Sequence, residues 1–83
     1  MYRVHVDKSA RKSALALPPH HLDRIEQALL RLVANPRPVG ARKLGNRLGW
    51  RIRVGDYRVL YEIDDSAQLV HVFEIAHRKD AYR

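Results

Sequence analysis

Apolar and polar residues alternate in several short segments of this 83-residue chain and recur at helical spacing in two others. The alternation over Tyr2–Val6 predicts a first β-strand. Asp7 and Ser9 are both suitable N-caps for a short helix that runs from Lys8 to about Leu17. We expect Pro18-Pro19 to end this helix, because the residue before a proline disfavours the helical conformation.

A longer amphipathic helix is expected from Pro19 to Ala34, since proline is tolerated in the first turn of a helix. Its apolar positions repeat with helical spacing and form one stripe: Leu22, Ile25, Leu29, Leu32 and Val33. The segment Asn35–Pro38 ends the helix. Residues 39–49 then form a basic, glycine-rich connector, in which a short extended piece is expected around Leu44.

The next segment predicts a β-hairpin. Trp50–Val54 and Tyr57–Ile63 both alternate, and Gly55-Asp56 suits a two-residue type II′ turn, which has glycine first. A turn over Asp64–Ala67 leads to a long final strand from Gln68 to Ala76, followed by a polar tail. The order β-α-α-β-β-β predicts a single α+β domain over residues 1–83, with two N-terminal helices packed on one face of a small, curved, mostly antiparallel sheet.

Pairing across the two-residue turn determines which hairpin side chains share a face of the sheet. The apolar side chains fall on one face, expected to lie under the helices: Trp50, Ile52, Val54, Tyr57, Val59, Tyr61 and Ile63. Arg51, Arg53 and Arg58 fall on the other face, with Arg53 directly opposite Arg58. Like charges paired in this way are destabilising. The pattern is typical of a solvated cationic face or, as we favour here, of a site for a phosphate backbone.

The overall charge supports an anionic partner. Lys and Arg number 16 against 9 Asp and Glu, which gives a net charge of +7. Nine of these cationic residues lie between Arg42 and Arg83, and most of the nine are arginines. Arginine binds phosphate and carboxylate through two parallel hydrogen bonds. The expected partner is therefore nucleic acid or an acidic protein.

Several classes of protein are excluded. The absence of cysteine rules out disulfide scaffolds and thiolate metal sites. No apolar stretch is long enough to span a bilayer, and the first residues lack the apolar core of a secretory signal, so a cytoplasmic protein without membrane contact is expected. His20-His21 lacks the spacing and partners of a metal site. No metal and no cofactor are therefore expected.

The final strand contains two candidates for proton transfer, His71 and His77. Strict alternation gives one face of this strand five residues: Leu69, His71, Phe73, Ile75 and His77. A two-residue turn at Asp65-Ser66 would bring that face to the arginines, whereas a longer loop would reverse the faces. His77, at the strand exit beside Arg78, is the better-placed candidate, since imidazole is the side chain whose charge changes nearest neutral pH.

Two blocks of the sequence together resemble the RelE branch of the RelE/ParE toxin superfamily. They are Trp50–Asp65, which contains the hairpin, and Ile75–Arg83, which carries a His-Arg-x-x-x-Tyr-Arg pattern. The resemblance extends over essentially the whole chain. It implies a RelE-like fold and the toxin of a type II toxin–antitoxin pair. RelE-like members enter the ribosomal A site and cut the bound mRNA, using a 2′-hydroxyl as nucleophile and no metal.

The resemblance also implies which residues act. A basic surface on the hairpin, an arginine after the last strand and a C-terminal tyrosine correspond here to Arg51, Arg53, Arg58, Arg78 and Tyr82. Relatives often have lysine at the first two of these positions. Because arginine does not give up its proton, we expect the arginines to stabilise charge and His77 to transfer the proton, with Tyr82 as second candidate. The remaining basic residues of this half are expected to bind RNA: Arg42, Lys43, Arg47, Lys79 and Arg83.

Other functions stay open. The same fold would suit a ParE-like inhibitor of DNA gyrase, which binds without cleaving, or an RNA-binding module without catalysis, or an inactive toxin that still binds its antitoxin. The resemblance implies a cognate antitoxin. Uncompensated arginines would attract an acidic, partly disordered segment of it, and an apolar groove across the two helices would accept an amphipathic helix.

Overall fold

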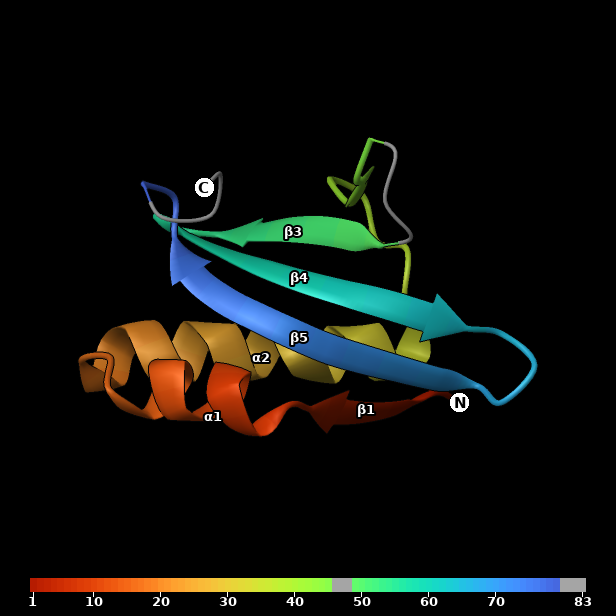
Figure 1. The fold of residues 1–83 in the computed structure, drawn as a ribbon, viewed down its shortest axis with the longest axis horizontal. Helices are drawn as coiled ribbons and strands as arrows, with labels where there is room; N and C mark the ends of the chain where they lie inside the picture. Colours follow the sequence, from red (N-terminus) through yellow and green to blue (C-terminus); the bar gives the residue numbers. More distant parts are fainter. Residues whose placement is uncertain (46–48, 80–83) are drawn as a thin grey trace.

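The structure, a computed structural model, describes residues 1–45 and 49–79. Two helices lie on one side of a five-stranded sheet, and the segment that contains β2 rises on the opposite side (Figure 1). In chain order the elements are β1 (Arg3–Val6), α1 (Lys8–Leu15), α2 (Pro19–Ala34), β2 (Arg42–Lys43), β3 (Trp50–Val54), β4 (Tyr57–Asp64) and β5 (Leu69–His77). The expected α+β fold is confirmed.

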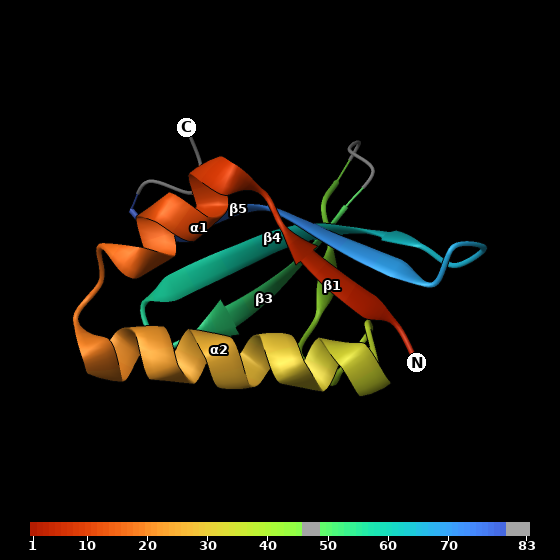
Figure 2. The same ribbon diagram turned by 90° about the horizontal axis from the view of Figure 1, so that it is seen from below.

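The sheet has the strand order β1-β5-β4-β3-β2. β1 runs parallel to β5, whereas the other neighbouring pairs are antiparallel. The two-residue β2 pairs with the start of β3 and accounts for the extended piece expected near Leu44. This pairing leaves the end of β3, next to Gly55, at an edge of the sheet beside α2 (Figure 2).

Both helices form where the apolar spacing predicts, with one difference at the end of α1. The helix stops at Leu15 rather than near Leu17. The N–H of Leu17 donates to the carbonyl oxygen of Ala14 at 3.0 Å, a tighter turn than that of an α-helix. The helix cannot continue beyond it, because Pro18 disfavours the helical conformation of the residue before it. The bounds of α2 agree with the expected ones, with proline at its first position.

The helices cover one face of the sheet, and this covered face holds the core. Ile25 and Leu32 of α2 are 1% and 0% exposed, and they pack with fully buried residues of the sheet such as Val59, Val70 and Val72. Burying an aliphatic side chain of this size contributes about 1.5–3 kcal/mol. The seven apolar hairpin residues expected on this face all belong to the core or pack against it.

Tyr61 carries a polar group into this core. Its side chain is fully buried, and its hydroxyl donates to the carbonyl oxygen of Pro36 at 2.8 Å. Burial raises the pKa of Tyr61 to about 12, because the charged phenolate is disfavoured away from water. The hydrogen bond holds the segment that directly follows α2 against β4, the central strand of the sheet.

The hairpin has the predicted register. Val54 pairs with Tyr57, and Arg53 lies directly opposite Arg58. Gly55 has a φ of 62°, while Asp56 keeps a negative φ, as a type II′ turn requires. The short turn therefore determined the faces of β3 and β4 correctly.

The faces of β5 differ from the prediction of strict alternation. The turn before β5 contains four residues, since Asp64 pairs with Leu69, and Gln68 adopts a positive φ of 51° there. A β-bulge then shifts the register between Leu60 and Tyr61, so that Phe73 is the extra residue on β5. From this point the side chains of β5 exchange faces, and Ile75 joins the core.

An ion pair ties the ends of several elements together beside the core. Asp65, in the turn after β4, accepts two hydrogen bonds from the Arg37 guanidinium, at 3.2 and 2.9 Å, and one from the Tyr2 hydroxyl at 2.5 Å. These bonds, that from Arg37 first, lower the pKa of the Asp65 carboxyl. The guanidinium carbon of Arg37 also lies 5.4 Å from the centroid of the Trp50 ring.

Among the described residues, no helix is long and apolar enough to cross a membrane.

Candidate nucleic-acid interface

The face of the sheet away from the helices, here the open face, gathers arginines on its β2–β3–β4 side. Register alone brings them together, because Arg51 lies between Arg42 and Leu60 on neighbouring strands and Arg53 lies opposite Arg58. We use the term arginine face for these four side chains: Arg42, Arg51, Arg53 and Arg58. Three strands therefore supply the cationic groups on a rigid scaffold.

The arginine face combines buried and exposed guanidinium groups. Arg51 and Arg58 are only 9% and 8% exposed, and both interact with other residues of the chain. Arg42 and Arg53 are exposed. Within residues 1–45 and 49–79, the structure pairs neither of these two with a carboxylate. Charges held near low-dielectric protein attract an anion more strongly than charges in bulk water do.

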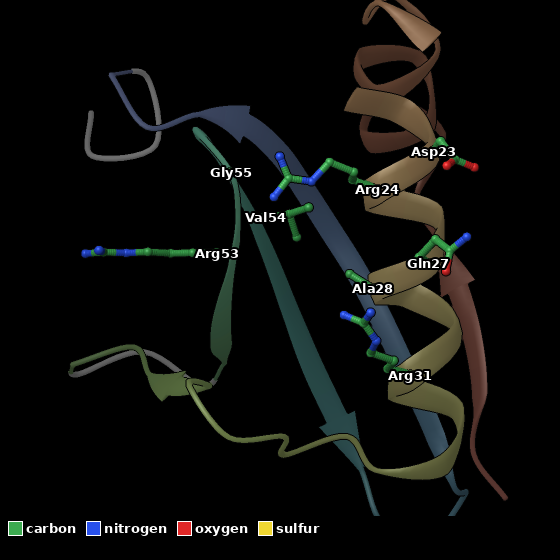
Figure 3. A pocket seen from close by; sticks show the side chains of 8 residues that line it. All are labelled: Asp23, Arg24, Gln27, Ala28, Arg31, Arg53, Val54 and Gly55. Carbon is green, nitrogen blue, oxygen red and sulfur yellow. The ribbon is translucent and has the colours of Figure 1, made fainter. Parts of the chain in front are cut away.

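A hollow of about 310 Å³ lies beside these arginines, lined by Val39, Gly40, Arg42, Arg51, Ile52 and Arg53. A second groove, of about 350 Å³, lies between α2 and the edge of β3. In Figure 3, Arg24 and Arg31 project from α2 toward β3, whereas Arg53 points away from the helix, on the far side of the strand. The Arg53 guanidinium therefore belongs to the open face, although its residue borders both hollows.

Arg78 follows β5 and lies beside the hairpin tip. Its backbone N–H donates to the carbonyl oxygen of Asp56 at 2.8 Å. Ala76, two residues earlier, is the cross-strand partner of Arg58. Arg78 is exposed, and the structure shows no ion pair for it within the described ranges. Its backbone is thus held against the hairpin turn, two residues before Arg58.

His77 does not join the arginines: of the two arrangements that the sequence left open for the final strand, the structure has His77 on the covered face. His77 is the cross-strand partner of Tyr57, and the two rings meet edge-on with their centroids 5.4 Å apart. The Tyr57 ring in turn lies 5.1 Å from His21 of α2, on the covered face. The physical cause is the β-bulge. The four-residue turn gives the same faces as a two-residue turn, and the extra residue at the bulge then moves His77 to the helical side.

The residues expected to bind RNA separate into several groups. Arg42 is part of the arginine face, but Lys43 pairs with Trp50 and alternates to the opposite face. Lys79 is exposed after β5, where its backbone N–H donates to Nδ1 of His77 at 3.3 Å. Arg47, Tyr82 and Arg83 lie outside the described residues.

Two features of the open face were missed by sequence reasoning. Glu74 pairs with Leu60 and is exposed, so a titratable carboxylate stands next to the row that contains Arg51. Phe73 also approaches this face: a Cβ built on Gly49 would lie 3.7 Å from Cε2 of Phe73. The bulge brings Glu74 to this face, whereas Phe73 reaches it by alternation from His71. The local pattern of β5 gives no signal for the bulge.

The chain resembles known proteins over nearly its whole length. The model of a family described as "ParE toxin of type II toxin-antitoxin system, parDE" matches residues 4–82. Toxin RelG of Mycobacterium tuberculosis is 36% identical over 84 residues, which cover 99% of this chain and 97% of that protein. Both matches extend over nearly the whole described structure.

Solved structures resemble the fold closely. The toxin–antitoxin complex RelBE2 of M. tuberculosis contains a chain that is 29% identical, with a TM-score of 0.82 and coverage of 93% of this chain and 98% of that one. The archaeal RelE–RelB complex of Pyrococcus horikoshii gives 27% identity, a TM-score of 0.81, and coverage of 96% and 98%.

Proposed function

Because this chain belongs to the RelE/ParE toxin superfamily, in its RelE-like branch, we propose that it is an endoribonuclease that cuts mRNA on the ribosome. Its family shows that it is a toxin of a type II toxin–antitoxin system. The single observation that carries the finer proposal is the arginine face, with two guanidinium groups buried at its centre, Arg51 and Arg58.

The proposed reaction uses the 2′-hydroxyl of the RNA as nucleophile. Attack on the adjacent phosphodiester forms a bond from the 2′-oxygen to phosphorus and places extra negative charge on the phosphorus oxygens. The bond to the 5′-oxygen of the next nucleotide then breaks, that oxygen takes up a proton from water, and a 2′,3′-cyclic phosphate remains. Guanidinium groups fixed on paired strands would stabilise that charge without reorganising, which is usually the largest catalytic term. Arg51 and Arg58 are the residues proposed for this role, with Arg53 and Arg78 at the periphery.

Proton transfer needs a different kind of side chain, because arginine stays protonated. The position of His77 on the covered face argues against the imidazole in this role. Glu74 is the titratable group that the bulge brings to the open face beside Leu60, and we propose it as the proton acceptor. Tyr82, outside the described residues, stays the candidate from sequence. Phe73 offers a ring on which an unstacked base could lie.

The proposed protein partner is a cognate antitoxin. Related toxins have been solved in complex with RelB antitoxins. An apolar groove of about 220 Å³ between α1 and α2 supports binding of an amphipathic helix, and apolar residues line most of it: Val6, Ala14, Leu15, Leu22, Ile25, Leu29 and Ile75. Acidic antitoxin residues would complement the net charge of +7.

A second candidate function is inhibition of DNA gyrase. The observation that favours it is the description of the matching family as ParE. Such an inhibitor would bind its target and would not need charge stabilisation at a reacting phosphate.

Mapping of RNA 5′ ends after induction in cells distinguishes these functions. The wild-type chain is expected to produce new 5′ ends within translated messages, and Arg58→Ala is expected to abolish them. Arg11→Ala removes an exposed arginine of α1 on the opposite side of the sheet and serves as the matched control, with cleavage retained. Loss of supercoiling activity by purified gyrase, without new 5′ ends, would instead establish the gyrase inhibitor.

A further inference from the structure

Two histidines that are distant in the sequence meet on the open face, on the side opposite the arginines. His5 of β1 and His71 of β5 are direct partners in the parallel pair, and their ring centroids are 5.6 Å apart. Asp7 follows β1 and alternates to the same side as His5. One ligand atom from each of these three side chains lies within 4.8 Å of the other two. We use the term histidine cluster for His5, Asp7 and His71.

The conformation of Asp7 is the first sign of a function beyond helix formation. Asp7 occupies the N-cap position of α1, where a carboxylate normally accepts a hydrogen bond from the first turn of the helix. Its side chain makes no such bond. Instead Oδ1 lies 3.2 Å from Nε2 of His71. The carboxylate is therefore directed into the histidine cluster.

The second ring nitrogen of His71 provides an independent sign. Nδ1 of His71 lies 3.8 Å from Oε1 of Glu62, its cross-strand neighbour on β4. Metal-binding histidines commonly use one ring nitrogen for the metal and direct the other toward a carboxylate, which orients the ring and increases its basicity. His71 therefore stands between a carboxylate that can share a metal with it and a carboxylate that can orient it.

We propose that the histidine cluster binds a divalent transition-metal ion of the zinc class. Two imidazoles and one carboxylate form a common ligand set for such ions. Bond lengths of about 2.0–2.1 Å place neighbouring ligand atoms of a tetrahedral site about 3.3 Å apart. The separation between Asp7 and His71 is already 3.2 Å, and His5, on an exposed edge strand, can close the remaining gap by rotation. Water would complete the coordination.

The bound ion would fasten β1 to β5 at the point where α1 begins. β1 is an edge strand with four residues paired to β5, so a bridge at His5 and Asp7 holds the strand at its end. This site is separate from the arginine face: its ligands lie on or next to β1 and β5, whereas the arginines lie on β2, β3 and β4. It does not depend on RNA cleavage, and a variant of the arginine face such as Arg58→Ala is expected to bind the metal as the wild type does.

Calorimetric titration of the full chain with Zn²⁺ tests the proposal. The wild type is expected to bind one Zn²⁺ per chain and to unfold at a higher temperature as the Zn²⁺ concentration increases. Glu62→Gln is expected to weaken binding about tenfold, since it removes the group that orients a ligand. His5→Asn and Asp7→Asn remove ligands and are expected to weaken binding further.

The adjacent pair His20-His21 provides the matched control. The centroids of these two rings are 4.0 Å apart on α2. The double variant His20→Asn/His21→Asn therefore tests whether Zn²⁺ binds adventitiously to neighbouring histidines. Unaltered Zn²⁺ binding by this control supports the proposal. Absence of saturable binding by the wild type, or binding that survives His5→Asn, would overturn the proposal. His71 would then simply be hydrogen-bonded to Asp7 with Glu62 nearby. Because His5 is exposed, its replacement preserves the fold; NMR signals of the wild-type imidazoles identify the ligands directly.

Discussion

The two faces of the sheet differ in what their residues do. On the covered face, side chains from β3, β4 and β5 pack under the helices, and the buried hydroxyl of Tyr61 has its hydrogen-bond acceptor in Pro36. The open face carries arginines on one side and the histidine cluster on the other. Like charges directly opposite one another, as at Arg53 and Arg58, oppose folding.

This difference separates stability from function. The apolar covered face supplies the free energy that holds the like-charged hairpin together. The open face can therefore keep cationic groups at a fixed spacing without an external anion. Substitutions on the two faces should have different consequences, so each can be used to test the division.

Arg51→Ala should produce a loss of activity as large as that of Arg58→Ala. Removal of one fixed charge-stabilising group from an active site costs about 10²–10³ in rate. Arg51→Lys keeps the charge but loses the two-pronged guanidinium, so a smaller loss is expected. Rates of mRNA cleavage on purified ribosomes measure both effects. A wild-type rate in Arg51→Ala would show that the open face is not catalytic.

Tyr61→Phe should affect stability and leave the chemistry intact. It leaves the buried carbonyl of Pro36 without its donor, and an unsatisfied buried group costs about 1–3 kcal/mol. Urea unfolding measures this free energy. The cleavage rate of the folded variant should stay near that of the wild type; a rate loss as large as that of Arg51→Ala would contradict the separation of the faces.

The same tyrosine predicts a dependence on alkaline pH. The folded pKa of Tyr61 is raised to about 12 from the ordinary 10.0, so its stabilising contribution is complete below pH 10 and is lost as the pH rises toward 12. The free energy of unfolding of the wild type should fall over this interval more steeply than that of Tyr61→Phe. Parallel curves for the two proteins would exclude this cause.

Asp65→Asn should weaken the fold in a manner that depends on acid pH. Arg37 and Tyr2 lower the pKa of the Asp65 carboxyl, so its contribution is present above the ordinary value of 3.8 and is lost as the pH falls below it. The wild type should therefore be more stable than the variant at neutral pH, and the difference should vanish in acid. If the difference in stability between the two proteins persists unchanged at low pH, its cause is packing and not the charge of Asp65.

His77→Asn should have the smallest effect on activity. The imidazole contacts Tyr57 on the covered face, whereas the arginines proposed to bind the reacting phosphate lie on the open face. Cleavage within about threefold of the wild-type rate is expected, the range typical of substitutions away from a site. A loss of a hundredfold or more would restore His77 as the proton-transfer residue.

Local rules predicted the hairpin well. Gly55-Asp56 permits a two-residue turn, and the turn fixes every pair in β3 and β4, including Arg53 with Arg58. The hairpin part of the arginine face, Arg51, Arg53 and Arg58, could therefore be derived from sequence, whereas the pairing that adds Arg42 could not. The helix α2 could be predicted in the same way, because its apolar stripe and Pro19 are both local signals.

Long-range features were beyond the sequence pattern. The bulge at Phe73 depends on how β5 adapts to β4. Alternation alone therefore left the face of His77 open and gave no reason to assign Glu74 to the open face. The parallel pairing of β1 with β5 joins the two ends of the chain. Without it, His5 and His71 look like unrelated histidines, and the prediction of no metal site considered only His20-His21.

The most direct test of the central claim is the single-turnover rate of cleavage of ribosome-bound mRNA by Arg58→Ala, measured at saturating protein. If the arginine face stabilises the transition state, this rate should fall by about 10²–10³ while affinity for the ribosome changes much less. A rate equal to that of the wild type, with affinity alone reduced, would contradict the account and make Arg58 only a binding residue.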